Sequence, residues 1–515
     1  MPKRSRNAVI AFIAWVLACL NASATFGQAS DSLLPALRQW TAQNQKRIVD
    51  ELIEFVRIPN VSANQPNIRR NAEHLLNLLK RRGLTAKLLE APMASPLVYA
   101  ELLRPGATST WVFYAHYDGQ PVEAREWASP PFEPTLRSGK LDQGGEVIPL
   151  PLANAQFDPE WRLYARAVAD DKGPIIAMLA ALDGVRAIGA QLKANLKFVF
   201  DGEEEIGSPN LRRILERHRE LLGGDLWIIC DGPQHQSGRT TVVFGVRGIQ
   251  SVELTVYGAN RELHSGHFGN WAPNPAMMLA QLVGSMKDRD GRIRISGFDA
   301  GLLPLSPAER AAIDAIPNDD SEQMRQLGLS RVEGSGQKLA ELITLPALNV
   351  RGLSSGRTGA EAANAIPSTA TASIDIRLVK GMTRENAVAA LIRHIEKEGY
   401  HVTAAEPDLK TLLEHARVAR VAVSPSGYNA SRTPMNLPVA QRLVSALQKS
   451  GTPLVLQPTM GGSLPLSVIE EAVGAPTLIV PTVNHDNNQH AKNENLRLGH
   501  LWNAIETMAA MFTMD

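Results

Sequence analysis

Short apolar runs alternate with amphipathic runs through the first half of the chain, and this alternation limits the fold more than any other feature. The apolar runs have the length of strands, and the runs between them have the apolar spacing of helices. The order is a strand at 112–115, a helix at 173–188, a strand at 196–200, a helix at 210–222 and a strand at 226–230. Strands that are apolar throughout need cover on both faces. The pattern therefore predicts an α/β sheet covered by helices on both sides.

The pattern changes near residue 240. Segments 249–257 and 370–379 place apolar residues at alternate positions, as half-exposed strands do. Helices are expected at 274–287 and 384–397, and the stretch 297–336 is irregular and polar. The first pattern returns after residue 434, with a helix at 438–449, a buried strand at 477–480 and a helix at 496–514. We expect one α/β domain, 31–240 and 431–515, interrupted by a smaller α+β domain, 241–430.

Composition narrows the function classes. The chain has 515 residues and a formal net charge of +1, which argues against a strongly electrostatic nucleic-acid binder. Its 2 cysteines exclude a disulfide framework and a cysteine-rich zinc module. Any metal or catalytic site must therefore use histidine and carboxylate side chains.

The first 29 residues have the layout of a secretory signal peptide. Lys3, Arg4 and Arg6 precede an apolar run from 8 to 20, which is too short to span a bilayer comfortably. Small residues follow, with candidate cleavage sites near 22–24 and 27–29. We expect an exported protein, periplasmic or secreted, without a stable membrane span. An uncleaved anchor and lipid attachment at Cys19 are the alternatives.

Polar side chains follow the predicted buried strands at their carboxyl ends. His116 and Asp118 follow the first strand, a run of acidic residues to Glu205 follows the second, and Asp231 follows the third. A loop with His485 and His490 follows the strand near residue 480. Ligands of open α/β sheets bind at the carboxyl ends of strands, so we expect these groups to meet at one edge.

Such a cluster predicts divalent metal ions. Several carboxylates at one edge repel one another unless a cation compensates them. Histidine with carboxylates and no thiolates suits zinc in a catalytic site, and manganese or cobalt fits the same donors. Five candidate ligands would serve two ions if one carboxylate bridges them: His116, Asp170, Glu205, Asp231 and His490.

Each motif also has an ordinary structural interpretation when taken alone. The 203–205 run is typical of a solvated acidic face, and Asp170 and Asp171 are typical of a helix cap. His116 and His490 are each compatible with an ordinary loop histidine. Their coincidence at predicted strand ends, in the order of one site, favours the metal interpretation.

The motifs together resemble a known family. The segments 115–118 (AHYD), 169–174 (ADDKGP), 203–208 (EEEIGS), 264–266 (HSG) and 490–494 (HAKNE) closely resemble those of co-catalytic zinc peptidases and amidohydrolases. This group includes carnosinase-type dipeptidases, carboxypeptidase G, acetylornithine deacetylase and succinyl-diaminopimelate desuccinylase. The resemblance spans nearly the whole chain after the leader. It implies a catalytic domain with a mixed sheet between helices, interrupted by a lid or dimerisation domain.

The resemblance also implies roles for individual residues around the metals. His116 and Asp231 would bind one metal, Glu205 and His490 the other, and Asp170 would bridge them. Glu204 would be the general base that deprotonates a water shared by the metals, and Asp118 would orient His116.

Further roles concern the substrate. His264 would reach the neighbouring subunit's site in a homodimer and polarise the scissile carbonyl. Arg377 would bind the substrate's free carboxylate, next to a backbone-donor loop that contains Gly462 and Ser463. A surface salt bridge for Arg377 and a structural role for His264 remain alternatives.

These roles predict an exported, metal-dependent hydrolase of amide bonds in small substrates with a free carboxylate, similar to dipeptidases or carboxypeptidases. Deacylation of N-acyl amino acids by the same chemistry is the first alternative. An inactive metal- or peptide-binding protein on the same fold is the second. The residues do not separate a peptide from an N-acyl amino acid as substrate.

Overall fold

The computed structural model describes residues 33–152, 156–334, 336–449, 451 and 453–514. Its larger part is built on an eight-stranded sheet with the strand order β1-β2-β6-β3-β7-β19-β8-β18. These strands are β1 (Thr85–Leu89), β2 (Leu97–Leu102), β3 (Thr110–His116), β6 (Asn195–Asp201), β7 (Leu226–Ile229), β8 (Thr241–Val243), β18 (Val455–Gln457) and β19 (Thr477–Ile479). The sheet is mixed, because β3 runs parallel to β6 and β7 while β2 runs antiparallel to β6.

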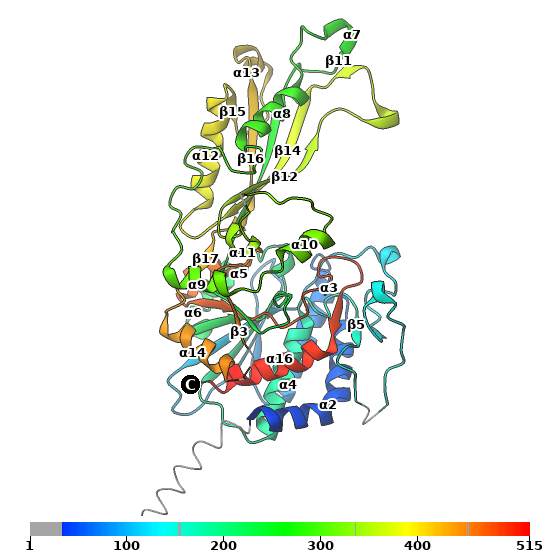
Figure 1. Ribbon diagram of the computed structural model, residues 1–515, viewed down its shortest axis with the longest axis vertical. Coiled ribbons are helices and arrows are strands. Elements are labelled where there is room, and N and C mark those ends of the chain that lie inside the picture. Colours follow the sequence, from blue (N-terminus) through cyan, green and yellow to red (C-terminus); the bar gives the residue numbers. More distant parts are fainter. Residues whose placement is uncertain (1–32, 153–155, 335, 450, 452, 515) are drawn as a thin grey trace, which may run out of the picture.

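Helices cover both faces of this sheet, as the apolar strands predict. One apolar cluster joins the sheet to α2 (Leu33–Val56), α3 (Gln65–Arg81), α4 (Lys172–Ala187), α14 (Pro438–Gln448) and α16 (Leu498–Phe512). A second cluster on the other face includes α5 (Leu211–Arg217), α6 (Arg219–Leu222) and α15 (Leu466–Val473). The α/β fold with a mixed sheet between helices is therefore confirmed (Figure 1).

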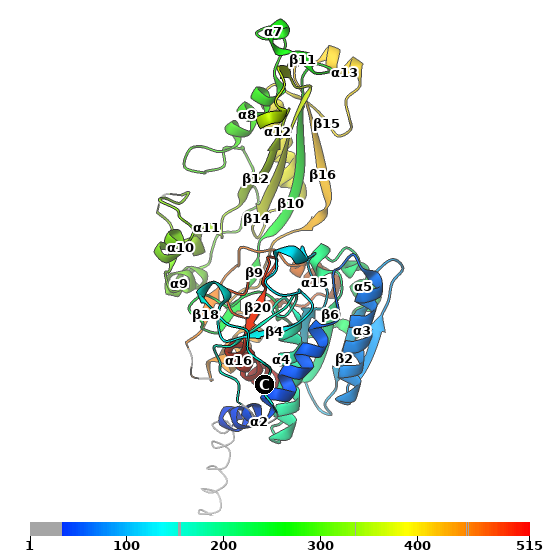
Figure 2. The same ribbon diagram turned by 90° about the vertical axis from the view of Figure 1, so that its right-hand side faces the viewer.

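A five-stranded sheet forms the smaller part, with the order β12-β14-β10-β16-β15. Its strands are β10 (Gly248–Tyr257), β12 (Ala347–Ser354), β14 (Thr369–Leu378), β15 (His401–Thr403) and β16 (Val418–Tyr428). Two helices, α8 (Pro275–Met286) and α12 (Arg384–Lys397), share one apolar cluster with the sheet. Along β10, buried residues that belong to this cluster alternate with more exposed residues, as expected of a strand with one packed face. Figure 2 shows this sheet extending away from the larger part.

Shorter elements complete the two parts. The short strands are β4 (Thr135–Arg137), β5 (Arg162–Tyr164), β9 (Gly245–Val246), β11 (Leu263–His264), β13 (Ala365–Ile366), β17 (Ser431–Arg432) and β20 (Asn495–Arg497). The short helices are α7 (Ser265–Phe268), α9 (Pro307–Ala315), α10 (Asp320–Gln326), α11 (Leu339–Leu342) and α13 (Leu409–Glu414). Four single turns are η1 (Ala124–Glu126), η2 (Leu141–Gln143), η3 (Glu204–Ile206) and η4 (Gly359–Glu361).

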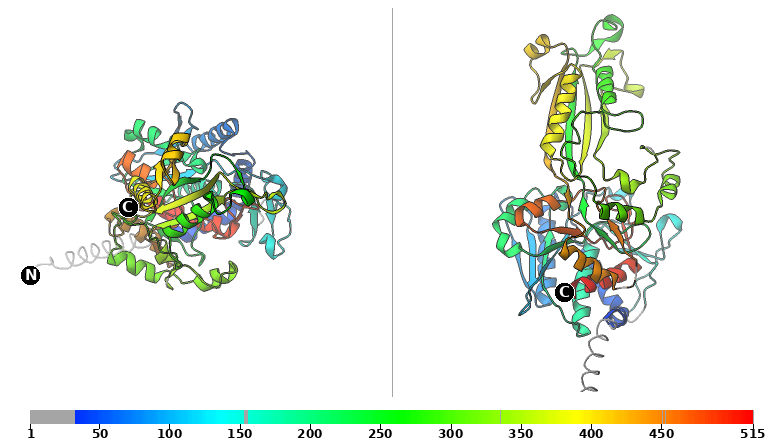
Figure 3. Two further views of the ribbon diagram at one scale, coloured as in Figure 1. Left: turned by 90° about the horizontal axis from the view of Figure 1, so that it is seen from above. Right: turned by 60° about the vertical axis from the view of Figure 1, so that its left-hand side comes forward.

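The stretch 297–336 is less irregular than the sequence predicts. It contains α9 and α10, and α9 begins with Ser306 and Glu309 bonded reciprocally to each other's backbone N–H. Glu309 also forms an ion pair of 2.8 Å with Arg432, which lies in the larger part. This stretch therefore lies against the larger part, below the five-stranded sheet (Figure 3).

The leader at 1–29 lies outside the described residues, so its signal-peptide character stays a prediction. Among the residues that the structure describes, no helix has the length and apolar character needed to cross a membrane.

Candidate metal centre and substrate site

Neighbouring strand ends bring the predicted metal ligands together. In the parallel registers, His116 of β3 lies opposite Asp201 of β6, and Tyr114 of β3 lies opposite Ile229 of β7. The residues that follow these strands therefore leave the sheet side by side, as expected for ligand sites of α/β sheets. Asp170 joins them from the turn that precedes α4, and a cis peptide bond connects it to Asp171.

Asp170 lies at the centre of the cluster, and its two oxygens face different histidines. Its Oδ1 is 3.0 Å from Nε2 of His116, and its Oδ2 is 3.1 Å from Nε2 of His490. Nε2 of His490 also lies 3.1 Å from Oε2 of Glu205. Nε2 of His116 lies 3.8 Å from Oδ2 of Asp231. The five predicted ligands thus divide into two groups that share Asp170.

These spacings fit divalent ions. Donor atoms around a tetrahedral zinc, with bonds of about 2.0–2.1 Å, lie about 3.3 Å apart. In each of two groups, the donor atoms all lie within 4.8 Å of one another. One group is His116 with Asp170 and Glu205, and the other is His116 with Asp171 and Asp231. Asp171 was not predicted as a ligand. Its Oδ2 accepts the backbone N–H of His116 at 3.2 Å, which gives it a role in holding that histidine.

The cluster has more negative charge than its histidines balance. Burial raises the pKa of Asp231 to about 7, and the nearby carboxylates of Asp170 and Glu205 add to this effect. Burial also raises the pKa of Glu204 well above its usual value. Hydrogen bonds to Asp170 and Glu205 raise the pKa of His490 to about 10. Bound divalent cations would relieve this repulsion, so the donor set fits metal ions in charge as well as in chemistry.

Asp118 connects the first strand end to the acidic turn η3. Its oxygens accept the backbone N–H groups of Glu204 at 3.2 Å and Glu205 at 3.1 Å, and the hydroxyl of Ser62 at 2.8 Å. Oδ1 also lies 3.3 Å from Nδ1 of His116, which has no hydrogen-bond partner among the described residues. Asp118 therefore holds both glutamates in place besides facing His116.

Glu494 is a positioning residue to which the sequence assigned no role. Its buried carboxylate accepts the backbone N–H groups of Ala167, Ala169 and Asp170 and a hydrogen bond from Arg166. These contacts fix the loop that presents Asp170. Glu494 ends the 490–494 motif that carries part of the family resemblance, but its burial and its partners could not be deduced without the fold.

A second polar cluster joins the two parts of the molecule. Arg377, near the end of β14, donates from Nη1 to the hydroxyl of Ser463 at 2.9 Å and from Nε to Asp375 at 2.9 Å. The Ser463 hydroxyl in turn donates to the carbonyl of Arg247 at 2.7 Å. Arg247, which the sequence did not single out, donates from Nε to the carbonyl of Gly461 at 3.1 Å. The predicted neighbours Arg377 and Ser463 are thus in contact, and Gly462 lies exposed between Gly461 and Ser463.

The two guanidinium groups of this cluster influence each other. Burial lowers the pKa of Arg247, and the positive charge of Arg377 lowers it further, while Asp375 opposes both effects. One carboxylate therefore faces two cations, which favours the binding of an additional anion.

His264 is not brought to the metal cluster within one chain. It is exposed at the end of β11, beside α7, at the end of the smaller part that lies farthest from the eight-stranded sheet (Figures 1 and 2). Its ring lies 4.3 Å from that of His267.

The fold and the clustered donors are those of a metal-dependent hydrolase. Among known proteins, the sequence model of peptidase family M20/M25/M40 matches residues 112–514. The chain belongs to this family of metallopeptidases, and the resemblance read from its motifs is confirmed.

Individual relatives match most of the length of this chain. It is 25% identical to the human Beta-Ala-His dipeptidase over 92% of this chain and 90% of that protein. It is 25% identical to the Cys-Gly metallodipeptidase of Saccharomyces cerevisiae over 81% of each chain. A solved M20 family metallo-carboxypeptidase of Sulfolobus solfataricus superposes with a TM-score of 0.75, at 27% identity, over 91% of this chain and 98% of that one.

Proposed function

We propose that this chain is an exported dipeptidase that uses two divalent metal ions, with zinc as the first candidate and manganese or cobalt as fitting substitutes. The observation that carries the proposal is the placement of Asp170, whose two oxygens lie 3.0 and 3.1 Å from two different histidines. One carboxylate between two donor groups is the arrangement that a bridged pair of ions requires. His116 and Asp231 would hold one ion, and Glu205 and His490 the other.

The bound ions would supply Lewis acidity at the scissile amide and lower the pKa of a nearby water. The chain's own residues would move the proton. Glu204 would remove a proton from the attacking water and transfer it to the leaving amine, as a general base and then a general acid. Asp118 would keep Glu204 in place through the backbone hydrogen bond of 3.2 Å.

The substrate's free carboxylate would bind at the Arg377 cluster. Hydrogen bonds to Asp375 and Ser463 hold the Arg377 guanidinium in place, and Arg247 adds a second positive charge beside it. A planar guanidinium recognises a carboxylate through paired hydrogen bonds. The dipeptidases among the relatives support a dipeptide as the substrate.

The smaller part would act as a lid and dimerisation domain. His264 is exposed and separated from the metal cluster of its own chain, so it would serve the site of a second subunit. There it would donate a hydrogen bond to the carbonyl oxygen as negative charge develops. Export rests on the basic and apolar segments before residue 30, and sequencing the amino terminus of the secreted or periplasmic protein tests it.

Metal analysis combined with a substrate panel tests the whole proposal. The purified protein is expected to contain about two divalent ions per chain and to hydrolyse dipeptides. Activity should disappear on chelation and return when zinc is added. A panel of dipeptides, acetyl-amino acids and succinyl-amino acids separates the dipeptidase from the deacylase. Full metal content without turnover of any substrate would contradict the proposal and favour a binding protein.

A further inference from the structure

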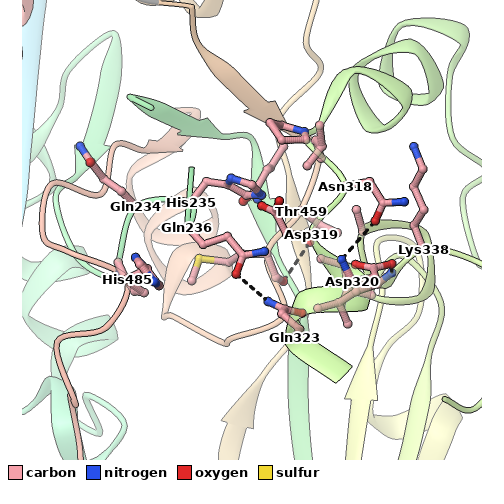
Figure 4. Close-up of a pocket in the computed structure, with 18 of the residues that line it drawn as sticks. Gln234, His235, Gln236, Asn318, Asp319, Asp320, Gln323, Lys338, Thr459 and His485 are labelled. Atoms are coloured by element: carbon pink, nitrogen blue, oxygen red, sulfur yellow. Dashed lines mark hydrogen bonds between the residues drawn. The ribbon is translucent and has the colours of Figure 1, made fainter. Parts of the chain in front are cut away.

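A polar pocket adjoins the loop that holds Gly462 and Ser463. Its volume is 310 Å³, at the lower end of the range of about 300–1,000 Å³ that is usual for ligand sites. The larger part contributes residues 233–236 and 457–460 and His485, and the stretch that leads to β12 contributes residues 316–320, Gln323 and residues near 340 (Figure 4). The pocket therefore lies between two regions of the chain, where ligand sites are common.

The pocket adjoins both halves of the candidate active site. Pro233 lines it two residues after Asp231, and Met460 lines it directly before Gly461. Cε of Met460 lies 3.6 Å from the position that a Cβ atom on Gly232 would take, and 3.4 Å from that on Gly462. Ile343, another lining residue, lies 3.6 Å from the corresponding position on Gly461. Met460 and Ile343 thus line the pocket where it adjoins the loop that contacts Arg377.

Amide side chains dominate the polar lining. Gln236 of the larger part accepts a hydrogen bond of 3.3 Å from Gln323 of α10 across the boundary (Figure 4). Gln234 is only 4% exposed, and its Oε1 has no hydrogen-bond partner among the described residues. His235 accepts the backbone N–H of Ser237 at Nδ1, so its neutral ring has its proton on Nε2. A ligand must therefore offer hydrogen-bonding atoms, because an aliphatic group would leave these polar groups unpaired.

Charge decides which polar group fits. Two carboxylates, Asp319 and Asp320, and one cation, Lys338, line the pocket. Asp320 already accepts the backbone N–H of Leu339 at 3.0 Å. The half-buried carboxylate of Asp319 has no hydrogen bond or ion pair with any residue in the described part of the chain. An acidic group would be repelled here, whereas an amine or an amide can donate to Asp319.

We propose that this pocket is a specificity subsite for an amine- or amide-bearing side chain of the substrate residue whose carboxylate binds Arg377. The inference rests on the proposed dipeptidase function and adds the class of substrate to it. The side chain of that residue is attached to the carbon atom next to the carboxylate. A carboxylate bound to Arg377 would therefore place this side chain beside the Gly461–Ser463 loop. Dipeptides ending in lysine or glutamine should therefore bind better than those ending in methionine, which has a similar length and no donor.

The test compares Ala-Lys, Ala-Gln, Ala-Met and Ala-Gly as substrates of the metal-loaded protein. The variant Asp319→Asn should raise KM for Ala-Lys about tenfold, because a charge-assisted hydrogen bond is lost. Its KM for Ala-Met and Ala-Gly and its kcat should stay within about twofold, since Asp319 does not contact the reacting atoms. Asp314→Asn is the matched control, an exposed aspartate of α9 outside the pocket, and should change none of these values.

A second variant, Ala340→Leu, narrows the pocket and should weaken Ala-Lys and Ala-Gln while sparing Ala-Gly. Equal KM changes for all four substrates, or none in either variant, would overturn the subsite while dipeptidase activity persists. If the unmodified protein hydrolyses no dipeptide, the proposed function fails and the subsite fails with it. If it hydrolyses Ala-Met as well as Ala-Lys and neither variant discriminates between them, the subsite alone is wrong.

Discussion

The two sheets of this protein differ in how far their candidate functional side chains are buried. At the edge of the eight-stranded sheet, His116, Asp170 and Asp231 are at most 5% exposed, and Nε2 of His116 lies 3.0 Å from Asp170 and 3.8 Å from Asp231. On the five-stranded sheet, His264 is exposed at one end, and Arg377 lies at the other end beside the larger part.

The difference follows from how each sheet is covered. A sheet with helices on both faces can enclose polar groups only at its edges, where loops supply their partners. A sheet packed on one face leaves the other free for contact with a partner or a substrate. We therefore expect metal binding and proton transfer in the larger part, and contacts to the carboxylate and carbonyl of the substrate in the smaller part.

The largest effect should come from the larger part. Glu204→Gln should lower kcat about a thousandfold, because proton transfer by a positioned base contributes about 10²–10⁴-fold. Metal content and circular dichroism should not change, since Glu204 is outside the proposed ligand set. Glu216→Gln, an exposed glutamate of α5, is the control. Near-normal kcat in the Glu204 variant would remove that residue from its role.

The second prediction concerns His264 across a dimer. His264→Ala should lower kcat about a hundredfold, as loss of one oxyanion donor does. Mixing this inactive variant with Glu204→Gln should restore roughly a quarter of normal activity, because half of the dimers are mixed and each has one intact site. No recovery after verified subunit exchange would show that His264 does not act in the partner's site.

The third prediction separates binding from chemistry. Arg377→Gln should raise KM for a dipeptide about 30-fold with little change in kcat, because it removes a charge-assisted contact to the substrate carboxylate. The same variant should hardly affect the corresponding dipeptide amide. An equal loss on both substrates would mean that Arg377 supports the structure and does not read the carboxylate.

The smallest effect concerns acid stability of the larger part. Burial lowers the pKa of His500 in α16 to about 4, and the charge of Arg497 adds to this. In the unfolded chain, the His500 ring binds a proton near pH 6.5. Its contribution to stability is therefore complete above that pH and falls between about pH 6.5 and 4. At pH 5 the loss is about 2 kcal/mol. His500→Gln should therefore show a smaller drop in Tm between pH 7 and pH 5, measured by calorimetry. An unchanged drop would exclude His500 as a source of acid sensitivity.

Some elements were not predictable from the sequence. The expected helix at 210–222 is interrupted at His218, where the chain forms the separate helices α5 and α6. The edge strand β12 carries mostly exposed residues, so its sequence lacks the apolar signal of a strand. Its place is set by pairing with β14, and pairing partners are invisible in a local pattern.

The sequence by itself determined the class of fold and the candidate donors of the site. Periodicity is a local property, and it distinguished strands buried on both faces from strands buried on one. The types of side chain that follow the buried strands predict divalent metal ions, since zinc-type ions select histidine and carboxylate donors.

Only the tertiary structure decided which atoms meet. Glu494 holds the backbone of Asp170 across 324 residues of chain, and Ser463 reaches Arg377 from another part of the sequence. The same fold leaves His264 exposed at the end of the smaller part that lies far from the metal cluster of its own chain. Contacts of this kind depend on the packing of whole layers against one another, and no local run of residues contains that information.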